Sequence, residues 1–221
     1  MKEPTGDGWE NVTPLCQDVD LTQSNSGGQS PTVFNQYPPA GNDTFDSGAQ
    51  VEIDLGEFGI ERLLLNGPTT IQRGEPHFPP SSTTKTIDTE ILSMDLTGQS
   101  PKLGPIRLRE SPTRASTGTV SQQTPGADFP ANSFFDVFVE IDTSLGTLHN
   151  EQPIRMQCSS LGLRGIPPLF DIFLMPPQMG PIQLYNSLGV AMGAITRVAH
   201  LPVPDREYVF IFVNRYIGTG Q

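Results

Sequence analysis

Charged residues, cysteine and long apolar runs are all scarce in this sequence, and each scarcity excludes a class of protein. Only 17% of the 221 residues are charged, against about 25% in an average globular protein. The net charge is −11, from 13 basic and 24 acidic residues. Because phosphate contacts need a basic surface, we predict no nucleic-acid partner. No apolar run approaches the roughly 18 residues of a membrane-spanning helix, so we also predict no membrane span.

Long helices are excluded as well, because glycine and proline, with 22 residues each, make up about a fifth of the chain. Both residues destabilise the interior of a helix. The sequence has instead a series of short apolar segments separated by turn signals. The clearest of them is Ser133–Asp142, in which Phe135, Val137, Val139 and Ile141 alternate with other residues and face one way.

Further segments fit strands of the same kind. Lys85–Leu96 is rich in threonine and isoleucine, and Leu188–Leu201 follows a turn signal. Tyr208–Val213 is apolar on both faces and predicts a buried strand. Short strands at this density predict an all-β fold, an antiparallel β-sandwich or jelly roll.

The first 50 residues differ in composition from the rest. Glycine, proline, serine, threonine and asparagine fill 24 of these positions, and seven acidic residues stand against one lysine. A free segment of this kind buries too little surface to offset its ordering entropy. We therefore predict an extended N-terminal arm over residues 1–50, held by the body of the protein or by a neighbouring subunit, and one β-sandwich domain over residues 51–221.

The two cysteines, Cys16 and Cys158, lie 142 positions apart, which is not the spacing of a metal site or a redox motif. In an exported protein they could form a disulfide between the arm and the domain, worth about 4–5 kcal/mol if unstrained. Two independent buried thiols are the alternative. Few lysines and two glycosylation sequons, at Asn11 and Asn42, favour an extracellular or cell-surface location over a cytoplasmic one.

No standard catalytic motif occurs in the chain: there is no nucleophile elbow, phosphate loop, dinucleotide fingerprint or HExxH. The three histidines, His77, His149 and His200, lie far apart and could share a metal only if the fold brings them together. We therefore expect a protein that is not an enzyme. A hydrolase whose site assembles from scattered residues, such as a carboxylate pair or a Ser-His-Asp set, is the less favoured alternative.

Two groups of oxygen-bearing side chains could bind calcium. They are Asp18 with Asp20, and Asn42 with Asp43 and Asp46. Hard oxygen ligands at alternating positions of a loop can wrap Ca²⁺, although neither group matches the twelve-residue EF-hand pattern. Solvated loop charges are the alternative. A calcium- or carbohydrate-binding module is thus the second hypothesis, with Ca²⁺ as its only expected cofactor.

The leading hypothesis concerns assembly. Val33, Phe34 and Tyr37 are apolar residues in the arm that could add a strand to the sheet of a neighbouring copy. Arg107 and Arg109 form a basic stripe that could receive an acidic surface of another copy or pair with carboxylates of the same chain. These features favour a non-catalytic structural protein, an extracellular subunit that forms homo-oligomers, filaments or a surface layer.

Three stretches carry a resemblance to a known kind of sequence: Arg109–Gly118 (RESPTRASTG), Phe129–Thr143 (FPANSFFDVFVEIDT) and Leu145–Cys158 (LGTLHNEQPIRMQC). Together they resemble an uncharacterised family of bacterial β-rich domains, over residues 50–210. The resemblance implies a bacterial origin and a single domain. It implies no activity and no site residues.

Overall fold

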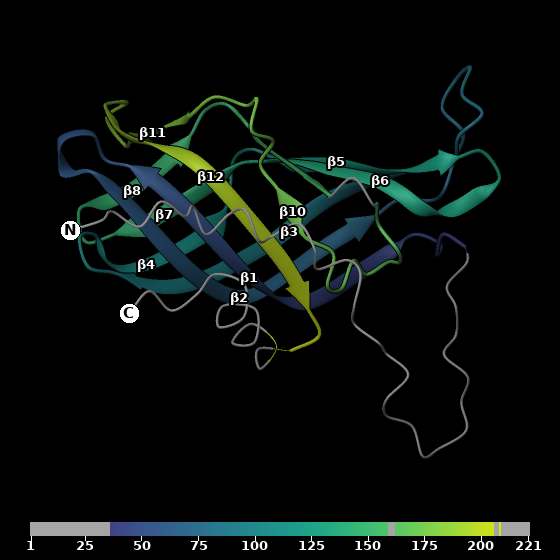
Figure 1. The fold of residues 1–221 in the computed structure, drawn as a ribbon, viewed down its shortest axis with the longest axis horizontal. Coiled ribbons are helices and arrows are strands. Elements are labelled where there is room, and N and C mark those ends of the chain that lie inside the picture. Colours follow the sequence, from purple (N-terminus) through teal and green to yellow (C-terminus); the bar gives the residue numbers. More distant parts are fainter. Residues whose placement is uncertain (1–35, 159–161, 206–207, 209–221) are drawn as a thin grey trace, which may run out of the picture.

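The computed structural model describes residues 36–158, 162–205 and 208 of the chain. This part consists almost entirely of antiparallel strands (Figure 1), and η1, a 3-10 turn over Gly56–Phe58, follows the first of them. The strands are β1 (Gly41–Asp54), β2 (Ile60–Arg73), β3 (Thr86–Ser100), β4 (Gly104–Glu110), β5 (Ser116–Thr124), β6 (Ala127–Val137), β7 (Val139–Thr143), β8 (Gly146–Asn150), β9 (Ile154–Cys158), β10 (Phe173–Leu174), β11 (Ile182–Asn186) and β12 (Ala191–Val203).

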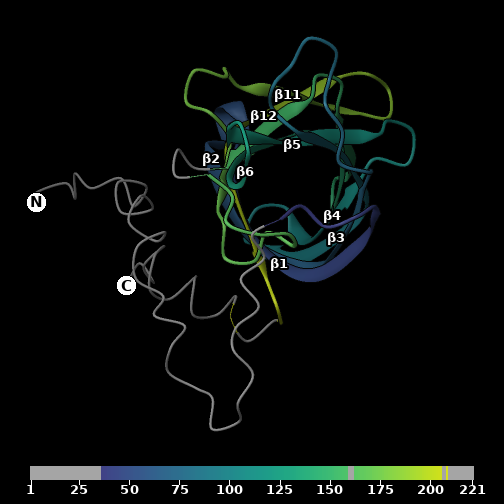
Figure 2. The ribbon, with the colours of Figure 1, turned by 90° about the vertical axis from the view of Figure 1, so that its right-hand side faces the viewer.

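All of these strands belong to one sheet, which closes on itself because β12 pairs with β1. Some strands join end to end: β3 pairs with β4 along one half of its length and with β5 along the other. In the same way the strands of each pair β4–β5, β6–β7, β8–β9 and β10–β11 lie end to end and together form one wall segment of the sheet. Each such pair, and each of the long strands β1, β2, β3 and β12, is called a stave below. The result is an up-and-down barrel of eight staves, in which every stave pairs with its neighbours in the sequence. Figure 2 looks along this barrel and shows the staves around a common axis.

The two ends of the barrel are built differently. At the β7–β8 end, short turns join β1 to β2, β3 to β4, β7 to β8 and β11 to β12. The β5–β6 hairpin projects from the opposite end (Figure 1), where longer segments join β2 to β3 and β9 to β10. Buried apolar side chains fill the interior toward the β7–β8 end; they include Ile53, Leu63, Leu65, Ile106, Ile141, Leu148 and Leu184. Each such side chain contributes about 1.5–3 kcal/mol of stability.

A polar network covers this packed end. Glu61 is only 6% exposed, and it accepts a hydrogen bond from Ser100 Oγ at 2.5 Å. Lys102 Nζ lies 3.5 Å from the other carboxylate oxygen of Glu61. Because its partners satisfy the buried carboxylate, the β7–β8 end is closed by paired polar groups above an apolar core.

The all-β, antiparallel fold predicted from the sequence is confirmed. Phe135, Val137, Val139 and Ile141 are all buried, as the alternation predicted, and Phe138 separates β6 from β7. Within this fold class, the strands form one closed sheet, whereas a sandwich or jelly roll has two sheets facing each other. Closure depends on which strands meet at the seam, and the strand pattern does not record this.

Part of the segment assigned to the N-terminal arm belongs to the wall of the barrel. Strand β1 begins at Gly41, so the last ten residues of that segment belong to a stave. Residues 1–35, which include Val33 and Phe34, lie outside the described residues, as do residues 209–213 of the predicted C-terminal strand. Within the described residues, no helix has the length and apolar character needed to cross a membrane.

Candidate ligand-binding cavity

The barrel is hollow away from its packed end. The cavity there holds about 690 Å³ free of atoms, counting the solvent at its opening, and the centre of a water molecule can reach about 60 Å³ of this space. Every stave contributes to the wall. The lining residues are Ala49, Val51, Thr69, Ile71, Ile91, Met94, Leu96, Leu108, Phe135, Val137, Val139, Ile154, Met156, Pro168, Phe173, Ile195, Val198, His200 and Pro202.

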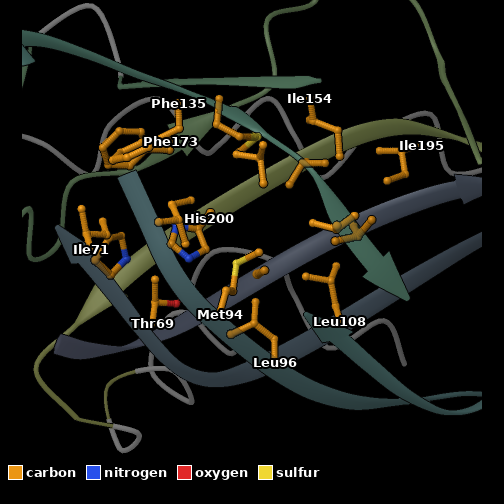
Figure 3. Close-up of a pocket in the computed structure, with 18 of the residues that line it drawn as sticks. Thr69, Ile71, Met94, Leu96, Leu108, Phe135, Ile154, Phe173, Ile195 and His200 are labelled. Atoms are coloured by element: carbon orange, nitrogen blue, oxygen red, sulfur yellow. The ribbon is translucent and has the colours of Figure 1, made fainter. Parts of the chain in front are cut away.

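The wall of this cavity, called the main cavity below, extends along much of β12. On β12 its wall runs from Ile195 to Pro202, which is about 20 Å along a strand at roughly 3.3 Å per residue. Figure 3 shows Phe135 and Phe173 toward one end of the wall and Leu108 and Ile195 toward the other. No lining residue carries a full charge at neutral pH, so the main cavity suits a slender apolar molecule.

His200 is the titratable residue of the main cavity (Figure 3). It lies on β12 between Ala49 of β1 and Phe173 of β10. Part of its surface is accessible, but Nε2 is buried and has no hydrogen-bond partner among the described residues. Burial lowers the pKa of His200 from 6.5 to about 4. The ring is therefore neutral at pH 7, and Nε2 can either donate or accept one hydrogen bond, depending on the tautomer.

A smaller cavity adjoins the main one toward the β5–β6 end. It holds about 340 Å³ free of atoms, of which the centre of a water molecule reaches about 20 Å³. Four residues line both cavities and form a partition between them: Ile71, Phe135, Pro168 and Phe173. The ring centroids of Phe135 and Phe173 lie 5.9 Å apart, in tilted contact. The two cavities are thus neighbouring parts of one interior space, separated by aromatic and apolar side chains.

A glycine makes room for the partition. Gly118 of β5 lies opposite Phe135 of β6, and a Cβ atom at Gly118 would lie 2.8 Å from the ring of Phe135. The same atom would lie 2.1 Å from the carbonyl oxygen of Phe134. Because only glycine avoids this overlap, β5 allows the Phe135 ring to approach the sheet closely.

Polar side chains lie around the smaller cavity, but the surface that faces the cavity is apolar. Arg73 Nη1 donates to Asp43 Oδ2 in an ion pair, and Arg73 Nε donates to the carbonyl oxygen of Pro39 at 2.8 Å. Thr89 Oγ1 and Ser133 Oγ are buried without a hydrogen-bond partner in the described part of the chain. The ion pair and the two hydroxyl groups therefore lie behind an apolar lining and are not exposed to the cavity.

The β5–β6 hairpin carries a separate polar cluster around Asp128. The Asp128 carboxylate accepts hydrogen bonds from Lys85 Nζ at 2.8 and 3.1 Å, from Gln122 Nε2 at 2.7 Å and from the Tyr37 amide at 2.7 Å. Burial raises the pKa of Asp128, but the bonds from Lys85, Tyr37 and Gln122 outweigh burial and lower it overall. The Tyr37 ring packs edge-on against Phe129 at 5.4 Å. Tyr37, which we assigned to assembly, thus joins the start of the described chain to the hairpin.

The residues proposed for calcium do not form a cluster where the structure describes them. Asn42, Asp43 and Asp46 lie along β1, and Asp43 faces Arg73. No group of three or more histidine, cysteine, aspartate or glutamate side chains that could hold a metal ion occurs in the described ranges. Asp18 and Asp20 lie outside them, so calcium binding by these two residues stays a prediction.

The basic stripe pairs with carboxylates of the same chain. Arg107 binds Asp95 through two hydrogen bonds of 2.8 and 2.6 Å, and Arg109 lies 3.3 Å from Glu140 and 3.0 Å from Asp142. The side-chain bond to Arg107 lowers the pKa of Asp95. These cross-strand pairs lie on β3, β4 and β7, so both arginines have partners within the barrel.

The remaining candidates lie apart from one another. Cys158 ends β9 and is half-buried against the core. Because Cys16 lies outside the described residues, the disulfide stays a prediction. His77 forms an isolated bridge with Thr86, and His149 contacts the Tyr185 ring at 6.3 Å. The structure therefore places only one of the three histidines, His200, in a cavity.

Thr89 and Ser133 are buried polar residues beside the smaller cavity that were not predicted from the sequence. Each occupies an inward position of its strand: Thr89 lies between Ile87 and Ile91, and Ser133 lies between Ala131 and Phe135. A polar residue at an otherwise apolar position of an alternating strand was the available signal. Which of these residues lack partners depends on the closed barrel and could not be read from the pattern.

Comparison with known proteins identifies the family. The model of a family of unknown function, DUF6073, matches residues 29–171. The chain belongs to this family. The predicted resemblance to an uncharacterised domain family is thereby confirmed. No curated protein matches the sequence.

One solved structure shares the fold. DynF, from the dynemicin biosynthesis pathway of Micromonospora chersina, is 18% identical to this member of the DUF6073 family, with a TM-score of 0.65. The match covers 81% of this chain and 92% of the DynF chain. The likeness at this identity concerns the fold.

The leading sequence-based hypothesis, a structural subunit that assembles into filaments or a surface layer, is wrong; the extracellular or cell-surface location stays a prediction. DynF, which shares the fold, is from a biosynthesis pathway, and this setting does not fit a filament or surface-layer subunit. The hypothesis required a sheet edge that could accept an added strand. Because β12 pairs with β1 and β3 pairs with β5, the sheet closes on itself, and the pairing of β6 with β9 starts only at Phe134.

Proposed function

We propose that this protein binds a small, largely apolar molecule inside its barrel. The observation that carries the proposal is the main cavity, whose wall comes from all eight staves and whose lining includes no charged residue. Barrels of eight strands have interiors that side chains can just fill, or that can hold one small ligand. Here the side chains fill the β7–β8 end and leave the rest open.

Energetic considerations support a binding role. Space left open in a protein core forfeits packing, at a cost of about 24 cal/mol for each Å³ of residual cavity. Larger side chains at positions such as Ala49 would recover that stability without changing the fold. The membership of DynF in a biosynthesis pathway is compatible with a ligand of the small-molecule class, since such a pathway contains small molecules.

The test is binding of a neutral apolar fluorophore, N-phenyl-1-naphthylamine, whose emission increases in an apolar environment. Wild-type protein should enhance the emission in a saturable manner. Ala49→Phe places a ring in the main cavity and should weaken binding by about tenfold or more, because the ring occupies the space that the fluorophore needs. The control is Ala191→Phe, which adds the same ring at an exposed position of β12.

Thermal unfolding followed by circular dichroism checks that both variants are folded. Absence of saturable enhancement in the wild type would contradict the proposal. Equal affinity of Ala49→Phe and wild-type protein would also contradict it, since the fluorophore would then bind outside the main cavity.

A further inference from the structure

Exposed apolar side chains gather at one end of the barrel. Ten large hydrophobic side chains of the described residues are exposed, and six of them lie in or beside three turns at the β7–β8 end. These six, called the apolar rim below, are Phe58 and Ile60 at the β1–β2 turn, Leu145 at the β7–β8 turn, and Leu188, Val190 and Met192 at the β11–β12 turn. Phe58 is 79% exposed, Leu145 69% and Leu188 84%. Single exposed apolar residues are ordinary, but a group of them on one surface marks an interaction site.

The three turns are neighbours around the end of the barrel. Asp54, at the end of β1, pairs with Ile60 of β2 and with Ala194 of β12, so the β1–β2 and β11–β12 turns lie side by side. Asn186 of β11 pairs with Leu148 of β8, so the β7–β8 turn comes next. Figure 1 shows these turns at the end of the barrel opposite the β5–β6 hairpin. The apolar rim therefore belongs to one end surface.

The turns that carry the rim satisfy their own backbone amides. The amides of Leu188 and Val190 both donate to Asn186 Oδ1 at 3.0 Å. The Phe58 amide donates to a carbonyl oxygen of its own turn at 3.4 Å, and the Leu145 amide donates to a threonine hydroxyl of its turn at 3.1 Å. A backbone group that is already bonded can enter a medium without water at little cost. The tips of the rim therefore suit contact with hydrocarbon.

The charge around the rim decides which apolar partner fits. Residues 172–196, which include the β11–β12 turn, contain no charged side chain. Asp54 and Glu57 are exposed at the β1–β2 turn, and Lys102 of the β3–β4 turn lies 3.5 Å from the Glu61 carboxylate. Two copies of a chain with a net charge of −11 would repel each other if these ends met. Anionic lipids would be repelled for the same reason, whereas zwitterionic lipids carry no net charge.

We infer that the apolar rim docks this protein on the surface of a zwitterionic lipid bilayer. Phe58, Leu145 and Leu188 enter the boundary between headgroups and acyl chains, while the body of the barrel stays outside the bilayer. The inference is independent of the ligand-binding function proposed above, because no residue of the rim lines the main cavity.

The experiment is flotation of the full-length protein with phosphatidylcholine vesicles on a density gradient at pH 7. Phe58→Ser and Leu188→Ser each remove one apolar side chain of the rim. Matched controls remove the same side chains elsewhere: Phe78→Ser at the opposite end, where Phe78 is 61% exposed, and Leu92→Ser in β3, where Leu92 is 43% exposed. Thermal unfolding followed by circular dichroism checks that all four variants are folded.

The wild type should float with the vesicles, in an amount that rises with the lipid concentration. Phe58→Ser and Leu188→Ser should each lower the partition coefficient by about threefold to tenfold, because each removes apolar surface that enters the bilayer. Phe78→Ser and Leu92→Ser should leave it unchanged. High salt should not release the protein, since the binding does not depend on attraction between charges.

Three flotation results would overturn the inference: no flotation of the wild type with phosphatidylcholine, equal losses for Phe58→Ser and Phe78→Ser, and flotation only when phosphatidylserine is present. Light scattering adds a fourth. An oligomer of the wild type that Phe58→Ser and Leu188→Ser dissociate would assign the rim to a second copy of the chain instead of a bilayer. None of these outcomes bears on the fluorophore test, so failure of this inference and failure of the proposed function are distinguishable.

Discussion

Acid should destabilise this protein through His200, and the size of the effect follows from its burial. The unfolded chain takes up a proton on this ring near pH 6.5, whereas burial lowers the pKa in the folded protein to about 4. Between these values the unfolded state binds more protons, so the free energy of unfolding falls as the pH falls. A difference of about 2.5 pKa units at 1.36 kcal/mol each gives a loss of about 3 kcal/mol. The loss begins below about pH 6.5 and is complete near pH 4.

The variant His200→Leu isolates this contribution. Urea unfolding at pH 7 and at pH 4.5, followed by circular dichroism, gives the acid-induced loss of stability for each protein. That loss should be about 2–3 kcal/mol smaller in His200→Leu than in the wild type, because leucine takes up no proton. His77→Leu removes a histidine whose ring is 44% exposed and serves as the control. Equal acid-induced losses in wild type and His200→Leu would refute the argument that the folded barrel keeps this ring uncharged.

Two further substitutions test the packing and the polar cluster. Gly118→Ala should lower the free energy of unfolding by about 3 kcal/mol or more, because the added Cβ would lie 2.1 Å from the Phe134 carbonyl oxygen. The control Gly165→Ala, whose Cβ would have no atom within 4 Å, should change it little. Urea unfolding at pH 7 measures both variants, and equal stabilities would contradict the role given to Gly118. Asp128→Asn should lower the free energy of unfolding by about 2–3 kcal/mol. This is less than the loss expected on breaking a fully buried ion pair, because the Lys85 side chain is 29% exposed. The difference in stability between the variant and the wild type should shrink as the pH falls. The pKa of Asp128 is lowered in the folded protein, so protonation of this carboxylate in acid destabilises the wild type. An equal difference at pH 7 and pH 3 would contradict the assignment.

The strands could be predicted from local patterns because alternation records which face of a strand is buried. The inward set Phe135, Val137, Val139 and Ile141 is a clear case, and each of these residues is buried in the barrel. Closure is different in kind. It depends on the pairing of β1 with β12, in which Asp46 lies opposite Val203, and no local signal specifies a contact between residues 157 positions apart in the chain. A sandwich and a barrel can therefore share the same strand pattern.

The candidate site was harder to predict because it depends on which inward side chains meet across the closed sheet and which do not. Ser47, Thr69, Thr89 and Ser133 are all small hydroxyl residues at buried positions. The first two bond each other across β1 and β2, whereas the last two have no partner among the described residues. The sequence shows the same residue types in the same alternating context. Only the register of the closed sheet decides which hydroxyls meet and which stay without a partner among the described residues.

The distribution of paired and unpaired polar groups ties the architecture to the proposed function. At the β7–β8 end, Glu61 is satisfied by Ser100 and Lys102, and at the β5–β6 hairpin Asp128 accepts four hydrogen bonds. Three of the five buried atoms without a partner in the described part of the chain belong to residues around the cavities, Thr89, Ser133 and His200. A buried polar group without a hydrogen bond costs about 1–3 kcal/mol of stability. This is large against a total free energy of unfolding of about 5–15 kcal/mol. A ligand that fills the apolar space of the main cavity would restore the packing lost there, so its binding should stabilise the barrel by an amount that rises with its affinity and concentration.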